Sequence, residues 1–304
     1  MTPTREHGSL GDNIKVHFAG AENSEFGYLL HDAGVNYFLF TVLPFIMDQF
    51  GVQWGGRLTL VKQLYPHEEL PKIANHVIMD SGLFSIMFGA CKNVNPDEKF
   101  IRRYKDAIVE FVHQNKAYGL TCVECDCQKL LGTDLAWELR TQMRDQIPNR
   151  IINVFHFEDG KKGLDRMIEF SEYIAISVPE LRIVKPKTYK EDTYRLASYI
   201  KEKKPEIDIH LLGGTEFEMV KRCKFCTSAD STSWLGVNRF GNVRGNRTRD
   251  IRNDKKQELK QRVTDVLEKL GIEVTEKRAD YFTNFWLSGH LYLNRYNKFA
   301  GSQD

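Results

Sequence analysis

Residues 151–212 read IINVFHFEDGKKGLDRMIEFSEYIAISVPELRIVKPKTYKEDTYRLASYIKEKKPEIDIHLL, and this stretch decides the fold class. Its short apolar, β-branched runs Ile151–Phe157, Tyr173–Val178 and Ile207–Leu212 are predicted strands. The segments between them, 162–172 and 187–203, carry apolar residues at helical spacing. Strands that alternate with helices of this length are typical of βα units in a parallel sheet.

The same alternation extends in both directions along the chain. It gives seven strands in all, and we expect the eighth strand of a closed barrel in the C-terminal stretch. The 304 residues contain no internal repeat and no obvious linker, so we predict one domain over residues 1–304. The predicted class is α/β, a (β/α)8 TIM barrel. The other predicted strands are Ile14–Ala21, His76–Asp80, Leu120–Asp126 and Phe225–Asp230, and the other predicted helices are 27–50, 97–115, 133–146, 216–223 and 253–270.

Composition and charge exclude some classes of protein. The chain is 41% hydrophobic and 28% charged, which is ordinary for a globular protein with a sizeable core. No run approaches the roughly 20 apolar residues of a membrane span, and no apolar signal core follows the N-terminus, so we expect a cytoplasmic protein without a membrane partner. The net charge is only +2, but residues 236–262 carry nine Lys or Arg against three Asp or Glu. This basic segment is a candidate surface for backbone phosphates.

Three predicted strands end in an acidic residue: Asp80, Asp126 and Asp230. Parallel barrels place their active sites at the C-terminal ends of the strands, so we expect these carboxylates to meet. Each of them alone has a plain structural explanation as well, because Asp is common in helix caps and turns.

Three motifs in this order carry a family resemblance. Residues 79–85 (MDSGLFS), 210–215 (HLLGGT) and 229–236 (ADSTSWLG, followed by Arg239-Phe240-Gly241) resemble the tRNA-guanine transglycosylase (queuine tRNA-ribosyltransferase) superfamily. The third motif is closer to the phage and bacterial DNA-guanine transglycosylase branch, and a phage-encoded protein would work in the host cytoplasm. The resemblance covers roughly residues 14 to 245 and implies that guanine in DNA is replaced by a 7-deazaguanine derivative.

The resemblance assigns a role to each of the three carboxylates. Base exchange that keeps the glycosidic configuration calls for two displacements, and a carboxylate suits the first, so Asp230 is the candidate nucleophile. Asp80 matches the residue that protonates the departing guanine and deprotonates the incoming base. Asp126 matches the residue that accepts hydrogen bonds from the guanine edge. No cofactor is required by this chemistry.

The implied base pocket adds neighbouring residues. Phe84 would stack on the base and Leu212 would close its other side, while backbone amides near Gly213 and Gly214 would hydrogen-bond the base, since glycine permits close approach. The plain alternatives stay open: Asp80 as a helix cap, Asp126 as a surface residue, Phe84 as core packing, and a strand histidine as a structural residue. The other residues placed in the pocket are Ser81, Gly82 and His156.

The cysteines mark a departure from the family. The bacterial tRNA enzymes bind structural zinc through cysteines and a histidine beyond the nucleophile strand, but no cysteine follows Cys226 here. We therefore expect a barrel without the usual zinc subdomain, which puts tRNA recognition in doubt. Cys122, Cys125 and Cys127 with Cys223 and Cys226 have zinc-like spacing. Because Cys122 and Cys125 would point to opposite faces of a strand, we expect thiols and no metal.

DNA is the predicted polymer, with tRNA as the runner-up and a free 7-deazaguanine base as the second substrate. The loop after the nucleophile strand would lie beside the reacting sugar, and its arginines would contact phosphates; a solvated surface loop is the alternative. Trp234 or Phe240 would help to stabilise an opened strand. Two other classes stay open, a barrel glycoside hydrolase and a non-catalytic nucleic-acid-binding barrel, and the oligomeric state is not predicted. The loop arginines are Arg239, Arg244, Arg247 and Arg249.

Overall fold

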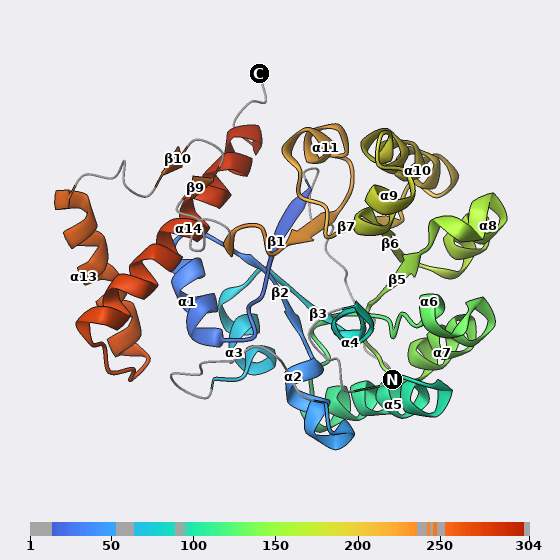
Figure 1. Cartoon of the computed structure of the whole chain (residues 1–304), viewed down its shortest axis with the longest axis horizontal. Coiled ribbons are helices and arrows are strands. Elements are labelled where there is room, and N and C mark those ends of the chain that lie inside the picture. Colours follow the sequence, from blue (N-terminus) through green and yellow to red (C-terminus); the bar gives the residue numbers. More distant parts are fainter. Residues whose placement is uncertain are drawn as a thin grey trace.

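Eight parallel strands close into a barrel in chain order, with β8 pairing back onto β1. The computed structural model describes residues 14–52, 64–88, 94, 96–235, 242–243, 246–247 and 253–300. Helices surround the strands (Figure 1), so the prediction of a (β/α)8 barrel is confirmed. The strands are β1 (Lys15–Ala19), β2 (Tyr37–Thr41), β3 (His76–Asp80), β4 (Thr121–Val123), β5 (Ile151–Phe155), β6 (Tyr173–Ser177), β7 (Asp208–Leu212) and β8 (Ser228–Ser231).

The long predicted helices lie where their periodicity placed them. Residues 97–115, 133–146 and 187–203 form α5 (Glu98–Gln114), α7 (Thr133–Gln146) and α10 (Tyr189–Lys203). The remaining helices are α1 (Ser24–Asp32), α2 (Leu43–Ile46), η1 (Met47–Phe50), α3 (Pro66–Ile73), α4 (Leu83–Phe88), α6 (Gln128–Leu131), η2 (Phe157–Asp159), α8 (Gly160–Phe170), α9 (Val178–Val184), α11 (Phe217–Arg222), α13 (Asn253–Lys269) and α14 (Glu276–Ala300); β9 (Asn242–Val243) and β10 (Asn246–Arg247) pair with each other.

The predicted helix over 27–50 and the predicted C-terminal eighth strand are both wrong. The missing strand is β2, which lies inside 27–50 and pairs with β1 and β3. Its sequence, YFLFT, has no polar alternation because Phe38, Leu39 and Phe40 are all buried between the barrel interior and the surrounding helices. A continuous apolar run of this kind does not distinguish a strand from a buried helix. The C-terminal stretch is helical and forms α13 and α14.

Side chains inside the barrel alternate with those that face the helices. Ile78, Val123 and Ile152 belong to the apolar cluster that fills the interior. Below the C-terminal ends of the strands this interior is also polar: His17 Nε2 lies 2.7 Å from His76 Nδ1, and His76 Nε2 lies 2.8 Å from Thr121 Oγ1. Burial, together with neighbouring histidine and arginine charge, lowers the pKa of His76 to about 4. His76 is therefore uncharged at neutral pH.

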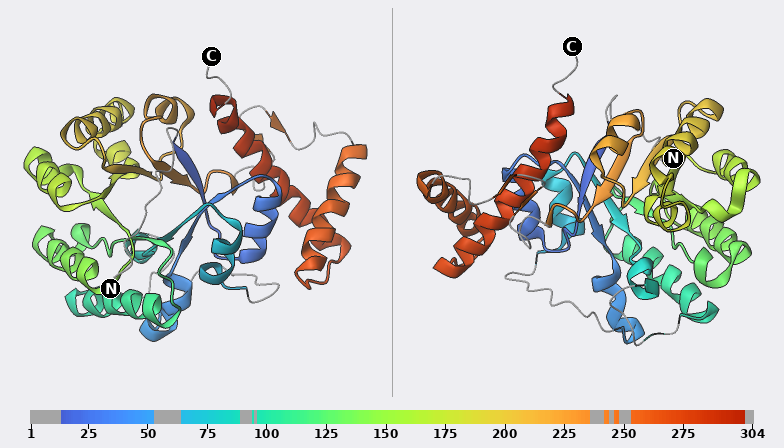
Figure 2. Two further views of the ribbon diagram at one scale, coloured as in Figure 1. Left: turned by 180° about the vertical axis from the view of Figure 1, so that it is seen from behind. Right: turned by 45° about the horizontal axis from the view of Figure 1, so that its top comes forward.

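Helices α13 and α14 pack together beside α1, outside β1 (Figures 1 and 2). Asp32 at the end of α1 accepts hydrogen bonds from Arg262 Nε at 2.7 Å and from Trp286 Nε1 at 2.8 Å. Arg262, at the end of the predicted basic segment, thus contributes to the packing of α13 on α1. Within the described residues, none of the helices has the length and apolar character that a membrane crossing needs.

Candidate active site

Asp230 lies at the C-terminal end of β8 with its side chain on the interior face of the barrel. It follows the inward-facing Ser228 by two residues, and Asp230 is 8% exposed. Its Oδ1 accepts hydrogen bonds from the Gly213 backbone N–H at 2.7 Å and from His210 Nε2 at 3.1 Å. These two donors hold the carboxylate in one orientation at the mouth.

A chain of buried hydrogen bonds continues from Asp230 into the barrel. His210 Nδ1 lies 2.5 Å from Ser228 Oγ, which lies 2.5 Å from the Tyr173 hydroxyl. His210, Ser228 and Tyr173 are fully buried. A ring proton on Nε2 lets His210 donate to Asp230, and Nδ1 then accepts from the serine hydroxyl, which in turn accepts from Tyr173. Polar residues of β6 and β8 thus fix the orientation of His210 on β7.

Asp80 occupies the corresponding place at the end of β3, two residues after the interior residue Ile78. Its Oδ2 accepts from the Gly82 backbone N–H at 3.0 Å. Burial and the negative charges of Asp230 and Asp126 raise the pKa of Asp80 to about 6, against the opposing effect of the Gly82 hydrogen bond. A carboxyl group with this pKa can donate and accept a proton near neutral pH.

Gly82 explains the Asp-Ser-Gly motif in structural terms. Its φ of +74° lies in the left-handed region, and a Cβ at this position would collide with Thr41 Oγ1 and lie 2.6 Å from Leu43 Cβ. The turn is also held by the Tyr104 hydroxyl, which donates to the Ser81 carbonyl at 2.6 Å. Ser81 and Gly82 therefore shape the loop that presents Asp80.

Glu22, which the sequence analysis did not select, is a fourth carboxylate near the mouth. Its Oε1 accepts from the Thr41 backbone N–H at 3.0 Å. Burial raises the pKa of Glu22 despite this hydrogen bond, and the charge of Asp80 raises it further. Glu22 lies three residues after the end of β1 and directly after the predicted strand 14–21, so the rule of acidic residues at strand ends applied to it as well.

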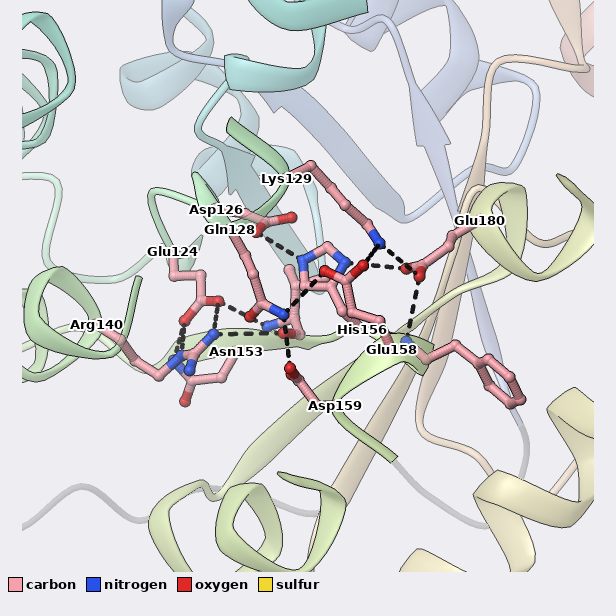
Figure 3. Close-up of polar contacts among 12 residues, drawn as sticks. Glu124, Asp126, Gln128, Lys129, Arg140, Asn153, His156, Glu158, Asp159 and Glu180 are labelled. Atoms are coloured by element: carbon pink, nitrogen blue, oxygen red, sulfur yellow. Dashed lines mark hydrogen bonds and ion pairs between the residues drawn. The ribbon is translucent and has the colours of Figure 1, made fainter. Parts of the chain in front are cut away.

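Asp126 and His156 are brought together, but not as two separate contacts to a base (Figure 3). His156 Nε2 lies 2.8 Å from Asp126 Oδ1, and His156 Nδ1 lies 2.9 Å from Glu180 Oε2. Burial would lower the pKa of His156, but its hydrogen bonds with Asp126 and Glu180 outweigh burial and raise the pKa to about 10. Both ring nitrogens of His156 thus have a carboxylate partner. The ring is an imidazolium at neutral pH, and its hydrogen bond fixes the orientation of Asp126.

The ion pairs around Asp126 and His156 extend to Lys129 and Glu158. Lys129 Nζ lies 3.0 Å from Glu180 Oε1 and 2.7 Å from Glu158 Oε2 (Figure 3). Glu180, at the start of α9, also accepts from the Phe157 backbone N–H at 3.2 Å. The loops after β4, β5 and β6 are thus joined by alternating charges that fix the position of Asp126.

Glu124 belongs to a separate, structural cluster. Arg140 donates to its two oxygens at 2.5 and 2.6 Å, and Asn153 Nδ2 donates to Oε2 at 2.7 Å. Glu124 and Arg140 are each 1% exposed. This pair ties α7 to the barrel below the Asp126 loop.

The remaining pocket residues divide into two groups. Phe84 is 62% exposed on α4, so it is not core packing, while Leu212 packs against the interior cluster at the end of β7. The Gly213 N–H donates to Asp230, and the Gly214 N–H donates to the Leu211 carbonyl at 3.2 Å. The amides that we expected to bind the base donate instead to Asp230 and within the turn.

Trp234 does not face the mouth, contrary to expectation. It is fully buried against Phe18 and Phe285, and its Nε1 donates to the Ala19 carbonyl at 2.8 Å. Its large ring fills the space between β1 and α14, so Trp234 is a core residue. Phe240, Arg239, Arg244 and Arg249 lie outside the described residues, and of Arg247 only the backbone in β10 is described.

Five cysteines, at positions 122, 125, 127, 223 and 226, are free and buried. Because β4 ends at Val123, the strand argument that separated Cys122 from Cys125 does not apply to Cys125. Burial raises the pKa of the Cys125 thiol well above its usual range. In the part of the chain that the structure describes, no group of three His, Cys, Asp or Glu side chains is arranged to hold a metal ion.

Comparisons with known proteins return general similarity to barrel structures. No protein-family profile matches the chain, and no curated protein matches it by sequence. Among solved structures, QR15, an aldolase, is 14% identical with a TM-score of 0.39, covering 72% of this chain and 89% of its own. The carboxyl transferase domain of Rhizobium etli pyruvate carboxylase with 3-hydroxypyruvate is 9% identical with a TM-score of 0.40, covering 94% of this chain and 48% of its own. Similarities of this size carry no argument about activity.

Proposed function

We propose that this protein is an enzyme, a base-exchange transglycosylase that replaces guanine in DNA with a 7-deazaguanine derivative. One observation carries the proposal: Asp80 and Asp230 end β3 and β8, and Asp126 follows β4, so three carboxylates lie at the same end of one closed parallel barrel. This is the end of the barrel where such folds carry their chemistry.

Asp230 suits the covalent step. Its Oδ1 is held by Gly213 and His210, so we assign the attack on the sugar C1′ to Oδ2. The bond from C1′ to the guanine nitrogen breaks as the bond to Asp230 forms, and the departing base takes its proton from Asp80. The incoming base loses a proton to Asp80, its nitrogen attacks C1′ and Asp230 is released as a carboxylate. Both displacements together conserve protons and sugar configuration.

Asp80 has the properties of the proton carrier in both steps. A pKa of about 6 leaves about a tenth of Asp80 protonated at pH 7, available as the acid, while the remaining carboxylate can act as the base. Asp126, with Oδ1 held by the charged ring of His156, keeps Oδ2 for the N–H donors of a guanine-like edge. The guanine edge presents these donors side by side, which suits an oriented carboxylate.

Base exchange tests the proposal directly. We expect the purified protein to incorporate labelled guanine into DNA, and nucleosides from DNA of cells that express it to contain a 7-deazaguanine. Asp230→Asn should abolish exchange, and Asp126→Asn should weaken base binding by about 5- to 150-fold through an unpaired amide. Asp145→Asn, the same change on an exposed helix, is the matched control. No incorporation into any polynucleotide, or full exchange by Asp230→Asn, would overturn the proposal.

A further inference from the structure

A cluster of exposed apolar and basic side chains follows β6 at the end of α9. Ile183 is 80% exposed, more than any other large apolar side chain of the described residues, and Val184 beside it is 48% exposed. Arg182, Lys185 and Lys187 are exposed around them. We call these five residues the α9 patch.

The exposure of the patch follows from how α9 is anchored. Val178 and Leu181 are buried against the barrel, and the turn after the helix is fixed by the Lys185 backbone N–H, which donates to the Leu181 carbonyl at 2.8 Å. The helix thus needs only its first turn for packing. Ile183 and Val184 contribute nothing to this core and extend their apolar surface into solvent, where it costs free energy.

The charged side chains of the patch itself are all basic. No acidic residue lies between Leu181 and Lys190 in the sequence, and Glu180 is turned inward to His156 and Lys129. The Arg182 guanidinium lies 5.3 Å from the centre of the Tyr189 ring, and Lys185 Nζ lies 5.3 Å from the centre of the Phe157 ring. Aromatic contacts thus position two of the cations without neutralising them.

Helix α9 also forms part of the wall of the candidate active site. Glu180, one helical turn before Ile183, binds the histidine that holds Asp126. On its other side, α9 packs on the turn that holds Asp230: a Cβ on Gly213 would lie 2.9 Å from Pro179 Cγ, and a Cβ on Gly214 would lie 2.6 Å from Val178 Cγ2. One short helix therefore connects the base-reading carboxylate, the nucleophile turn and the exposed patch.

We propose that the α9 patch is the surface that grips DNA beside the reacting nucleotide, with its cations on phosphates and Ile183 and Val184 as an apolar wedge. This inference rests on the proposed function. An enzyme that acts at C1′ of a guanosine in duplex DNA must extrude that nucleotide, and apolar side chains that insert between base steps stabilise the opened stack. A surface that combines basic and apolar side chains next to the site has the properties that this step requires.

Two sets of variants test the two parts of the patch. Arg182→Ala, Lys185→Ala and Lys187→Ala together should flatten the dependence of log Kd on log salt for a fluorescent DNA oligonucleotide, by up to about 0.9 per lost phosphate contact. The matched control is the triple replacement by Ala of Lys203, Lys221 and Lys224, exposed lysines outside the α9 patch that precede β7 and β8 in the chain. The control should keep the wild-type slope.

The wedge is tested by Ile183→Ser with Val184→Ser. We expect exchange into duplex DNA to fall about tenfold or more relative to exchange into single-stranded DNA, because only the duplex has a stack to hold open. Both residues are exposed, so the fold should survive, and circular dichroism checks that it does. An unchanged ratio would overturn the wedge.

The outcomes separate this inference from the proposed function. Exchange by the wild type, with the salt slope unchanged in the triple variant, overturns the patch and leaves the transglycosylase intact. If the triple variant has a reduced salt slope but the wild type exchanges no base, the patch is supported as a DNA surface and the transglycosylase proposal is overturned. A slope that falls for tRNA but not for DNA overturns the assignment to DNA. Self-association of the wild type that Ile183→Ser with Val184→Ser abolishes would assign the patch to a second copy of the chain and overturn the inference.

Discussion

His210 Nε2 lies 3.1 Å from Asp230 Oδ1, and the two residues project from neighbouring strands into the same end of the barrel. The ring is held from behind by Ser228 Oγ, and Ser228 by Tyr173. The candidate nucleophile is thus oriented by a fixed imidazole as well as by the Gly213 N–H. In the proposed reaction His210 would act through Asp230, as a positioning residue.

Replacing His210 therefore should impair exchange through kcat. His210→Phe keeps a buried ring but removes the donor, and loss of a hydrogen bond to a charged group of about 1.5–3 kcal/mol corresponds to a fall of about 10- to 150-fold. His210→Gln retains an amide donor and should recover part of the loss. Steady-state kinetics of both variants check this, with KM for DNA expected to stay constant. Equal activity of His210→Phe and wild type would remove the positioning role.

The pKa of Asp80 should report the charges around it. We expect carboxyl carbon NMR to give Asp80 an apparent pKa of about 6 in the wild-type protein. Asp126→Asn and Asp230→Asn each remove a negative charge that opposes ionisation, so each should lower the pKa of Asp80 toward its ordinary value of 3.8. Asp145→Asn, on an exposed helix surface, should leave it unchanged. If neither Asp126→Asn nor Asp230→Asn changes the pKa of Asp80, the three carboxylates do not share a site.

His156 should make the stability of the protein fall at alkaline pH. Its pKa is about 10 in the folded state against 6.5 for the free side chain, so its stabilising charge is fully present below pH 6.5 and is lost as pH rises from 6.5 to 10. The expected loss of unfolding free energy over this window is on the order of a few kcal/mol. Urea denaturation at several pH values measures it.

The matched comparison for this window is between His156→Gln and the exposed His113→Gln. His156→Gln should be less stable than wild type at pH 6 and should show a smaller further loss up to pH 10, whereas His113→Gln should follow the wild-type curve. Parallel curves for His156→Gln and wild type would show that His156 carries no charge in the folded protein.

Local pattern was sufficient for most of the barrel but not for β2. Alternation of apolar runs with helical periods placed seven strands because each run was bounded by polar turns. Tyr37–Thr41 has no such boundary on its C-terminal side, where Val42–Ile46 continues the apolar run into α2. Only pairing with β1 and β3 selects the strand, because that pairing supplies the hydrogen bonds that the helix would otherwise make.

The candidate site divides in the same way. Asp80, Asp126 and Asp230 follow from the sequence, because acidic residues that end parallel strands must gather at one end of a barrel. The partners of these carboxylates do not follow from it: His210 was part of a glycine motif, Glu180 lay outside every predicted strand and helix, and His156 was assigned to the base rather than to Asp126. Ile183 and Val184 would be assigned to the core by hydropathy, and Trp234 was assigned to the mouth although it lies in the core.

The sequence by itself determined the alternation of elements, the barrel class and the chemistry available at the ends of its strands, because these depend on local periodicity and residue type. The tertiary structure alone decided where the eighth strand lies, which residues hydrogen-bond to each carboxylate, and which apolar side chains remain exposed. These depend on distances between residues far apart in the chain, and burial, hydrogen bonding and pKa are set by those distances rather than by spacing along the sequence.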